Sequence, residues 1–257
     1  MIKTLLQKLI RFINISLFTN TLPLKVSIYF HETYENDIED IERIILFFKK
    51  EGYEFVTIDN FNRHLDDSNK HFAFTFDDGF ANWVDTLEVF KKYNVKSTFF
   101  MNSIQFTDES KVKFLSDINC PDEDMLIDEK GLEKIVKAGH EIGAHTHSHR
   151  TLKRLTEEEF TTEINKNIEI LNSLGIRPLN FAIPFGMRRY INQSQLDYLN
   201  SIFNSVSYGE PGMLYNQIPG KIQRYPWRTQ KSFKFNIQNI SANTILFNNL
   251  TKRSGLG

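Results

Sequence analysis

Along most of this chain, short β-rich runs alternate with longer stretches of helical periodicity, and few folds accommodate such an order. The first pair is a strand expected at residues 26–30 and a helix expected at residues 37–50, in which apolar side chains recur every three or four positions. Consecutive strands joined by helices run parallel, because each return to the sheet needs a crossover connection. The pattern therefore predicts an α/β fold with a parallel sheet, and both an open sheet and a closed barrel fit a chain of this length.

The alternation continues to about residue 201 without an internal repeat, a low-complexity tract or a Pro/Gly-rich linker. Further strands are expected at 55–58, 72–76, 97–101, 141–144 and 179–183, and further helices at 81–93, 129–138, 157–174 and 193–201. Residues 102–128 are too acidic and irregular for one element, so we expect a loop with some local helix there. The pattern predicts a single domain over residues 21–257, preceded by a separate segment over residues 1–20.

The first eighteen residues are rich in Leu, Ile and Phe, but Lys3, Lys8 and Arg11 interrupt them. These charges leave neither the continuous apolar stretch of a signal peptide nor the about 20 apolar residues of a membrane span. The apolar residues fall on one helical face, which predicts an amphipathic helix over residues 1–20. That helix either packs on the body of the protein or lies on a membrane, with its basic residues at anionic lipid headgroups. We therefore expect the protein in the cytoplasm or at the inner membrane face, with residues 1–18 as the segment that would make peripheral membrane contact.

The composition removes several classes of protein from consideration. A chain of 257 residues buries roughly 70–75% of the surface that its unfolded form exposes, so it builds a core without covalent or metal cross-links. Cys120 is the single cysteine, which rules out an intrachain disulfide and a cysteine-rich zinc module. With 31 Lys plus Arg against 32 Asp plus Glu, the chain lacks the basic excess of a nucleic-acid-binding protein, and we expect no nucleic acid partner.

An acidic pair, Asp77 and Asp78, lies in the segment Thr75-Phe76-Asp77-Asp78-Gly79 at the end of an expected strand. In a parallel α/β fold, ligands and catalytic groups gather at the carboxyl ends of the strands. Two adjacent carboxylates at such a place repel each other unless a cation or a proton divides their roles. A plain turn is an equal alternative, because Asp-Gly is a common turn pair and an Asp can cap the helix that follows.

Four of the seven histidines lie within the ten residues from His140 to His149. The spacing of His145 and His149 lets one helical turn or a tight loop bring both imidazoles to one ion, and zinc favours imidazole nitrogen. Local hydrogen bonding is the alternative for any of these residues, and it is our expectation for His140 and His147.

Together with the acidic pair, His145 and His149 suggest a catalytic metal site. Two His and one Asp give three ligands and leave positions open for water and substrate, unlike a closed structural site. A metal of this kind lowers the pKa of a bound water to about 7, and a second carboxylate beside it can take the proton. Asp78 would then be the ligand and Asp77 the base, with hydrolysis of an amide or ester as the natural reaction.

Three segments in this order, TFDDG at 75–79, HTHSH at 145–149 and FAIPFG at 181–186, resemble the polysaccharide deacetylases of carbohydrate esterase family 4. The resemblance spans about residues 25–227. It implies a single-domain α/β fold, a distorted (β/α)7-type barrel, and the removal of N-acetyl or O-acetyl groups from glycans with a divalent metal. We expect zinc as the metal, with nickel and cobalt as alternatives.

The same resemblance implies a role for each matching residue. Asp77 would be the general base. Pro184 and Phe185 would bind substrate as one wall of the groove, and the backbone N–H after Pro184 would donate to the oxyanion, a contact worth about 3–4 kcal/mol in the transition state. The metal ligands would be Asp78, His145 and His149.

Two departures from the family pattern refine the assignment. Many members have Arg where this chain has Ala182, and many place a catalytic-acid His near the C-terminus, whereas no histidine follows His149 here. His31 ends the first expected strand and would point into the same mouth as Asp77, so we expect it to be the catalytic acid. This arrangement resembles the poly-N-acetylglucosamine deacetylase branch, in which the motif order is permuted, the acid His follows the first strand and the third motif lacks Arg.

Two residues near the end of the matched stretch have two interpretations each. Arg224 either replaces the missing motif Arg as the partner of Asp77 or is a surface or structural residue. Trp227 either stacks on a sugar ring, as a substrate-binding residue, or is a core aromatic.

These features predict a metal-dependent deacetylase that hydrolyses the N-acetyl group of an N-acetylhexosamine in a surface polysaccharide or its precursor. A deformylase or deacylase acting on a lipid-linked or nucleotide-linked sugar would keep the same site. A glycan-binding homologue with a catalytically weak site is a further alternative. It is disfavoured because Asp77, Asp78, His145 and His149 are all present.

Overall fold

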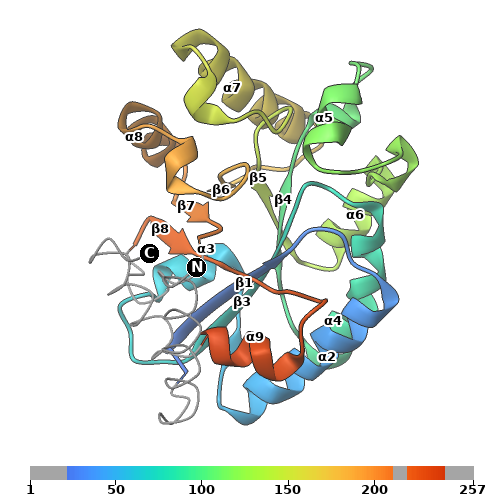
Figure 1. The fold of residues 1–257 in the computed structure, drawn as a ribbon, viewed down its shortest axis with the longest axis vertical. Coiled ribbons are helices and arrows are strands. Elements are labelled where there is room, and N and C mark those ends of the chain that lie inside the picture. Colours follow the sequence, from blue (N-terminus) through green and yellow to red (C-terminus); the bar gives the residue numbers. More distant parts are fainter. Residues whose placement is uncertain (1–21, 211–218, 241–257) are drawn as a thin grey trace, which may run out of the picture.

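Among the residues that the structure describes, nine strands form one parallel sheet, and eight of them follow one another in the order β8-β7-β6-β5-β4-β3-β1-β9 (Figure 1). The computed structural model describes residues 22–210 and 219–240, and the helix expected over residues 1–20 lies outside them. The two ends of this strand order, β8 and β9, are separated in sequence by Arg224 alone, so the sheet curls into a nearly closed barrel. The expected α/β barrel is confirmed, with eight strands around it where the resemblance implies seven.

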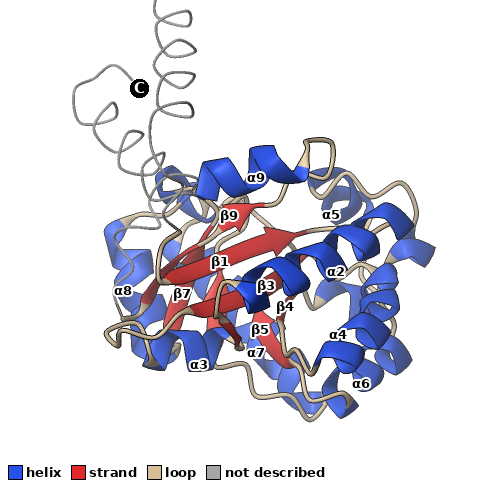
Figure 2. Ribbon diagram, turned by 90° about the horizontal axis from the view of Figure 1, so that it is seen from below, coloured by secondary structure: helices blue, strands red, loops and turns tan. Residues whose placement is uncertain are grey.

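Helices lie on the outside of the strands (Figure 2). The strands are β1 Lys25–Phe30, β2 Glu54–Phe55, β3 His71–Asp77, β4 Thr98–Met101, β5 Glu141–Ala144, β6 Asn180–Ala182, β7 Ser205–Tyr208, β8 Lys221–Gln223 and β9 Tyr225–Pro226. The α-helices are α2 Glu35–Lys50, α3 Ile58–Arg63, α4 Leu87–Tyr93, α5 Val112–Asp117, α6 Glu129–Lys137, α7 Glu157–Ser173, α8 Gln193–Ile202 and α9 Phe233–Ile240. Within the described residues, no helix has the length and apolar character that crossing a membrane requires.

Most expected elements lie within two residues of their observed positions, and the strand expected at 141–144 coincides with β5. The strand expected at 55–58 is wrong in its second half. Strand β2 ends at Phe55, and α3 begins at Ile58, whose backbone N–H donates to Oγ1 of Thr98 at 2.8 Å. The sequence pattern also misses β7, β8, β9 and α9, because these strands are short and carry little apolar periodicity.

Phenylalanine rings fill the layer between strands β1, β3 and β4 and helices α2 and α4. Phe76 of β3 stacks on Phe99 of β4 with ring centroids 4.7 Å apart, and Phe48 of α2 lies 4.3 Å from Phe72 of β3. All four rings are fully buried. Burying a Phe side chain contributes roughly 1.5–3 kcal/mol, so this layer holds the helices firmly against the strands that carry the site.

Helix α3 closes the N-terminal end of the barrel. Further inside the barrel, level with Asp77, Gly143 of β5 makes room for the ring of Phe100, since a Cβ at this position would lie 2.4 Å from the ring. Residues of α3 and of four strands form one buried cluster that includes Ile58, Phe61, Ala73, Phe100, Ala182 and Ile222. With one end packed in this way, the polar residues of the predicted site gather at the other end.

Candidate active site

A cavity of about 500 Å³ lies at the carboxyl ends of the strands. This is the end at which parallel α/β folds place their ligands. Six of the residues that the sequence assigns to the site line this cavity, from the ends of four different strands: His31 after β1, Asp77 and Asp78 at the end of β3, His145 and His149 after β5, and Phe185 after β6. The acidic pair is therefore a neighbour of His145 and His149 in space, although more than 65 residues separate them in sequence.

Asp78, His145 and His149 converge on one point in this cavity. Their ligand atoms all lie within 4.8 Å of one another, and Nε2 of each imidazole is 3.3 Å from Oδ1 of Asp78. That Oδ1 is buried without a hydrogen-bond partner among the described residues. Such an atom is costly to leave unpaired, whereas a divalent cation between the three groups would bind all of them. The residues present therefore fit a metal ion.

The protonation states of the triad also suit a cation. Burial acts to raise the pKa of Asp78, but the imidazoles of His149 and His145 outweigh it and hold that pKa well below its usual range. Burial lowers the pKa of His149 to about 4, and the charge of Asp78 only partly opposes this shift. An ionised carboxylate and a neutral imidazole are the forms that bind metal, so at neutral pH neither residue has a proton to lose before an ion binds.

Four residues at the site have left-handed backbone conformations. The angle φ is 87° at Asp78, 67° at Thr146, 59° at His149 and 61° at Phe185. Such a conformation costs of order 1–3 kcal/mol in residues other than glycine, and it persists where surrounding contacts enforce it. The presence of four such residues at one site indicates that surrounding contacts hold this strained backbone in place and so direct these groups toward one point.

Two buried asparagines hold the loop that carries His145 and His149. Asn102 donates from Nδ2 to the carbonyl oxygens of His145 and Thr146. Asn167 of α7 donates to the same Thr146 carbonyl at 2.7 Å. These contacts satisfy the backbone of a strained loop without using the imidazoles. The sequence analysis missed both residues.

A backbone carbonyl fixes the orientation of the His145 ring. Its Nδ1 lies 2.8 Å from the carbonyl oxygen of Ala182, which leaves Nε2 to face Asp78. A backbone carbonyl behind a ligating histidine sets the tautomer of the ring and directs the other nitrogen toward the ion.

The other two histidines of this stretch, His140 and His147, make local hydrogen bonds, as expected. Nδ1 of His147 lies 2.9 Å from the hydroxyl of Ser103, and its Nε2 lies 3.3 Å from Glu109. Nδ1 of His140 lies 2.9 Å from the hydroxyl of Ser97. Both rings are buried away from the triad, so they support the structure and are not ligands.

Asp77 pairs with a buried arginine. Nη1 and Nη2 of Arg224 lie 2.6 and 2.8 Å from Oδ1 and Oδ2 of Asp77, which is the bidentate geometry of a strong ion pair. Arg224 is fully buried in the seam between β8 and β9, and its guanidinium lies 5.0 Å from the ring centroids of Tyr29 and Phe100. Of its two interpretations, Arg224 is therefore the partner of Asp77 and not a surface residue.

His31 lies at the rim of the cavity. Its side chain is 55% exposed, and its Nε2 is 3.9 Å from Oδ2 of Asp78. Its ring meets the ring of Tyr29 edge-on, with centroids 5.4 Å apart. His31 is thus outside the triad but adjacent to it, in a position open to a bound molecule.

Phe185 forms one wall of the cavity. Its ring is 41% exposed and meets the His149 ring edge-on, with centroids 4.6 Å apart. Its backbone N–H donates to no described residue, whereas the next N–H, of Gly186, donates to the carbonyl of Ile183 at 2.9 Å. Pro184 is buried behind this wall. The N–H after Pro184 is therefore free among the described residues, beside the triad.

A comparison with known protein families shows to which of them the chain is related. Residues 64–202, more than half of the chain, match the family model described as polysaccharide deacetylase. The chain belongs to the polysaccharide deacetylase family. The match includes Asp77 and the triad, but it begins after His31 and ends before Arg224.

Curated relatives resemble part of this chain. It is 34% identical over 117 residues to a peptidoglycan-N-acetylglucosamine deacetylase of Bacillus cereus, a stretch that covers 44% of this chain and 36% of that protein. It is 29% identical over 120 residues to a chitin deacetylase of Arthroderma benhamiae, which covers 46% of this chain and 28% of that protein. The chain thus spans only about a third of the length of these relatives.

Solved structures share the fold of this chain. A Streptococcus pyogenes deacetylase in complex with acetate has a TM-score of 0.65 at 17% identity, over 84% of this chain and 98% of that one. A de-N-acetylase from Aggregatibacter actinomycetemcomitans has a TM-score of 0.64 at 14% identity, over 84% and 99%. At these identities the likeness shows the fold alone.

Trp227 packs in the core beside the mouth of the barrel. It is 5% exposed, its indole N–H donates to Oδ2 of Asp40 at 3.3 Å, and its ring meets Phe233 of α9 edge-on at 5.5 Å. Trp227 borders a second hollow beside His31, but so little of the residue is exposed that the burial favours the core-aromatic interpretation over stacking.

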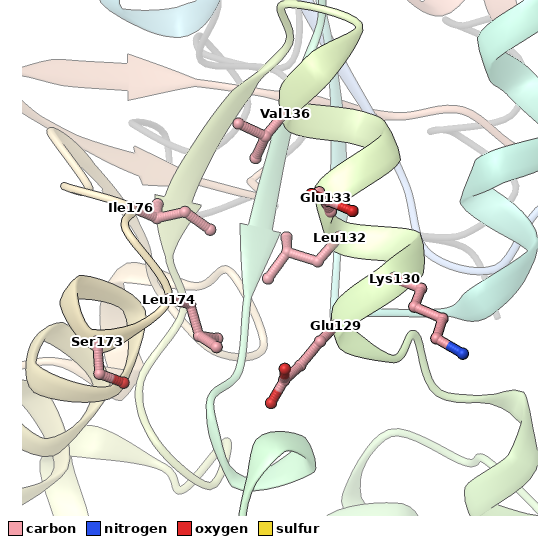
Figure 3. Close-up of a pocket in the computed structure, with 8 residues that line it drawn as sticks. All are labelled: Glu129, Lys130, Leu132, Glu133, Val136, Ser173, Leu174 and Ile176. Atoms are coloured by element: carbon pink, nitrogen blue, oxygen red, sulfur yellow. The ribbon is translucent and has the colours of Figure 1, made fainter.

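A separate hollow of about 440 Å³ lies between α6 and the residues that follow α7 (Figure 3). Leu132, Leu174 and Ile176 line it, with Glu129 and Lys130 at its edge. None of the sequence-predicted site residues borders it, and it shares no residue with the cavity at the strand ends. The sequence-predicted site residues therefore lie at the strand ends and not in this hollow.

The buried pair makes Arg224 a stability determinant. We expect Arg224→Met to lower the free energy of unfolding by about 3–5 kcal/mol, because it leaves the carboxylate of Asp77 buried and uncompensated. Urea denaturation measures the change. Arg228→Met, at an exposed position four residues further along, is the control and should shift stability by about 0.5 kcal/mol or less. Equal effects of the two substitutions would show that the Asp77–Arg224 pair adds nothing.

Proposed function

We propose that this polysaccharide deacetylase is a metal-dependent N-deacetylase that acts on an N-acetylhexosamine in a surface polysaccharide or its precursor. The observation that carries the proposal is the convergence of Asp78, His145 and His149 around a buried, unpaired carboxylate oxygen, in a cavity that Asp77 also lines. Three ligands beside a separate carboxylate are typical of a catalytic metal site. We propose zinc as the ion, because two of the three ligands are imidazoles.

The residues of the cavity divide the work of amide hydrolysis. A divalent cation held by the triad would polarise the amide carbonyl and lower the pKa of a water molecule to about 7. Asp77 accepts a proton from the attacking water, and Arg224 holds both oxygens of Asp77 in one orientation. The N–H of Phe185 donates to the carbonyl oxygen as it becomes negative. Cleavage of the C–N bond then gives acetate and an amine.

We propose that His31 protonates the leaving amine. It stands at the rim of the cavity with Nε2 3.9 Å from Asp78 and most of its side chain open to a bound substrate. Among the described residues, His31 is the one histidine outside the triad that lines the cavity. An acid after the first strand agrees with the proposed relationship to the poly-N-acetylglucosamine deacetylase branch.

His31→Ala is expected to lower turnover by about 10²–10⁴-fold while the metal content stays the same, because the substitution removes an acid and no ligand. Acetate release and elemental analysis of the purified variant measure the two effects. His64→Ala, at an exposed position that contacts His71 at the other end of the barrel, is the matched control. If His31→Ala turned over as fast as the parent protein, His31 would not be the acid. If the variant lost its metal, His31 would be a ligand.

A matched pair of substrates tests the proposed reaction. We would follow acetate, formate and new amines from an N-acetylglucosamine oligomer and from its N-formyl analogue, with zinc, cobalt or nickel present. The proposal predicts acetate and an equal amount of amine from the first substrate. Release of formate alone would indicate a deformylase. Binding of the oligomer without any product over all three metals would indicate a glycan-binding protein.

A further inference from the structure

Helix α7 hydrogen-bonds to the loop that carries His145 and His149. We call residues 145–149 the histidine loop. Two polar residues of α7, Glu163 and Asn167, are four positions apart and therefore lie on the same face of the helix, one turn from each other. Both are buried, with 7% and 1% of their surfaces exposed. A buried carboxylate and a buried amide need partners inside the protein, and both residues find them in the histidine loop.

Glu163 holds the middle of the histidine loop through three hydrogen bonds. Its Oε2 accepts from the backbone N–H of Ser148 at 2.9 Å, and its Oε1 accepts from the hydroxyl of Ser148 at 2.6 Å. The backbone carbonyl of Glu163 accepts from the N–H of His147 at 3.1 Å. Hydrogen bonds to a carboxylate are roughly twice as strong as those between neutral groups. One residue of α7 therefore holds both the backbone and the side chain of Ser148.

The backbone beside Ser148 is strained on both sides. Thr146 and His149 have φ angles of 67° and 59°, and the hydroxyl of Thr146 accepts from the N–H of His149 at 3.0 Å within the loop. On the backbone of Ser148 and His149, the hydrogen bond that comes from outside the loop, among the described residues, is the one to Glu163. A left-handed conformation persists only where surrounding contacts enforce it. For this half of the loop, Glu163 supplies that contact.

The two imidazoles of the triad are oriented in different ways. Nδ1 of His145 lies 2.8 Å from the carbonyl oxygen of Ala182, whereas Nδ1 of His149 is buried without a hydrogen-bond partner among the described residues. The direction of the His149 ring therefore depends on its backbone and on the ring of Phe185 beside it. Because the N–H of Ser148 directly precedes His149, the carboxylate of Glu163 fixes the backbone from which this imidazole projects.

We propose that Glu163 is a positioning residue for the metal ion, which holds Ser148 and thereby keeps the imidazole of His149 directed at Asp78. Without this hold, the ion would have to order the histidine loop as it binds, and its affinity would fall by the free energy of that ordering. The inference rests on the proposed metal-dependent function and deepens it. Glu163 does not line the cavity of the triad, so it acts through the loop and is not a catalytic residue.

The test measures the zinc affinity of the full chain, freed of metal, by competition with a chelator of known affinity. Glu163→Ala should raise the Kd for zinc by about 10–100-fold, as the loss of a group that supports a ligand usually does. Glu163→Gln should stay within about twofold of the parent, because a glutamine amide can accept from the N–H of Ser148 and donate to its hydroxyl oxygen. Each Kd is measured at a temperature at which circular dichroism shows the variant to be folded.

A spectrum gives a second readout that does not depend on turnover. With cobalt in place of zinc, the visible absorption bands report the arrangement of the ligands around the ion. These bands should change in Glu163→Ala, because His149 then approaches the ion differently, and should match those of the parent in Glu163→Gln.

Ser148→Ala tests the same contact from its other side. It removes the hydroxyl bond to Glu163 and keeps the backbone bond, so the Kd for zinc should rise by about threefold to tenfold, less than in Glu163→Ala. In the double variant it should add nothing to the effect of Glu163→Ala, because the two residues act through one contact.

Thr156→Ala is the matched control on the same helix. The hydroxyl of Thr156 accepts from the N–H of Glu159 at 3.2 Å in the first turn of α7, so its loss should lower the melting temperature. The printed contacts of this hydroxyl lie within α7 and not in the histidine loop, so the Kd for zinc should stay at the parental value.

Three results would each overturn the inference: a parental Kd in Glu163→Ala, a Kd in Glu163→Gln as weak as in Glu163→Ala, or an equal loss of affinity in Thr156→Ala. If Glu163→Ala does not fold, a parental Kd in Ser148→Ala overturns it instead. A parent protein that binds zinc but releases no acetate would contradict the proposed function and leave this inference standing. A parent protein that binds no zinc would contradict both.

Discussion

Asp77→Asn is expected to slow acetate release by about 10²–10⁴-fold while the protein binds metal with unchanged stoichiometry. An asparagine amide cannot accept a proton from the attacking water. The substitution leaves Asp78, His145 and His149 in place. Elemental analysis of the purified variant and acetate release at saturating zinc check the two halves of this expectation.

The same substitution has a structural cost that must be separated from the chemical one. Arg224 would keep its charge in the barrel without a carboxylate partner, so the free energy of unfolding should fall by about 3–5 kcal/mol. Assays below the melting temperature of the variant keep the two effects apart. Asp59→Asn is the matched control, since it breaks the 2.7 Å pair of Asp59 with Arg63 at the other end of the barrel. It should leave turnover and metal content unchanged, whereas loss of metal in Asp77→Asn would show that the two aspartates exchange roles.

His145→Ala is expected to abolish both metal binding and acetate release. The variant would leave Asp78 and His149 to hold the ion and would remove the ring whose Nδ1 is fixed on the Ala182 carbonyl. Because loss of a residue behind a ligand already costs about 10–100-fold in metal affinity, loss of the ligand itself should cost more than about 100-fold. Zinc titration calorimetry and acetate release measure the two losses.

His147→Asn is the control within the same motif. His147 bonds to Ser103 and Glu109 and contributes no atom to the triad, so its variant should lose some stability but keep one metal per chain. Stoichiometric zinc in His145→Ala, or metal loss in His147→Asn alone, would contradict the assignment of ligands.

The barrel itself is largely predictable from sequence, because its longer strands carry a strong local signal. All seven residues of β3, His71–Asp77, are buried, and their aromatic and β-branched composition marks them as a strand. Strand β7 is different, since Ser205 and Ser207 alternate with Val206 and Tyr208 over only four residues. A run this short cannot be told from a loop until its neighbours β6 and β8 are in place.

The convergence of Asp78, His145 and His149 is also predictable, because motif and chemistry agree on these three residues. The partner of Asp77 is not, since whether Arg224 is buried depends on how the two edges of the sheet meet. Among the supports that the sequence analysis missed, Asn167 has a detectable signal. It lies on the same buried face of α7 as Ile164, where a polar residue must find partners inside the protein.

Zinc titration of the metal-free protein decides whether the triad is the centre of the reaction. The readout is the initial rate of acetate release from an N-acetylglucosamine trimer as zinc is added. We predict a rate near zero without metal, a linear rise to one zinc per chain, and a constant rate beyond that point. Full acetate release in the presence of a strong chelator, or a rate that does not respond to zinc, cobalt or nickel, would contradict a metal-dependent deacetylase centred on Asp78, His145 and His149.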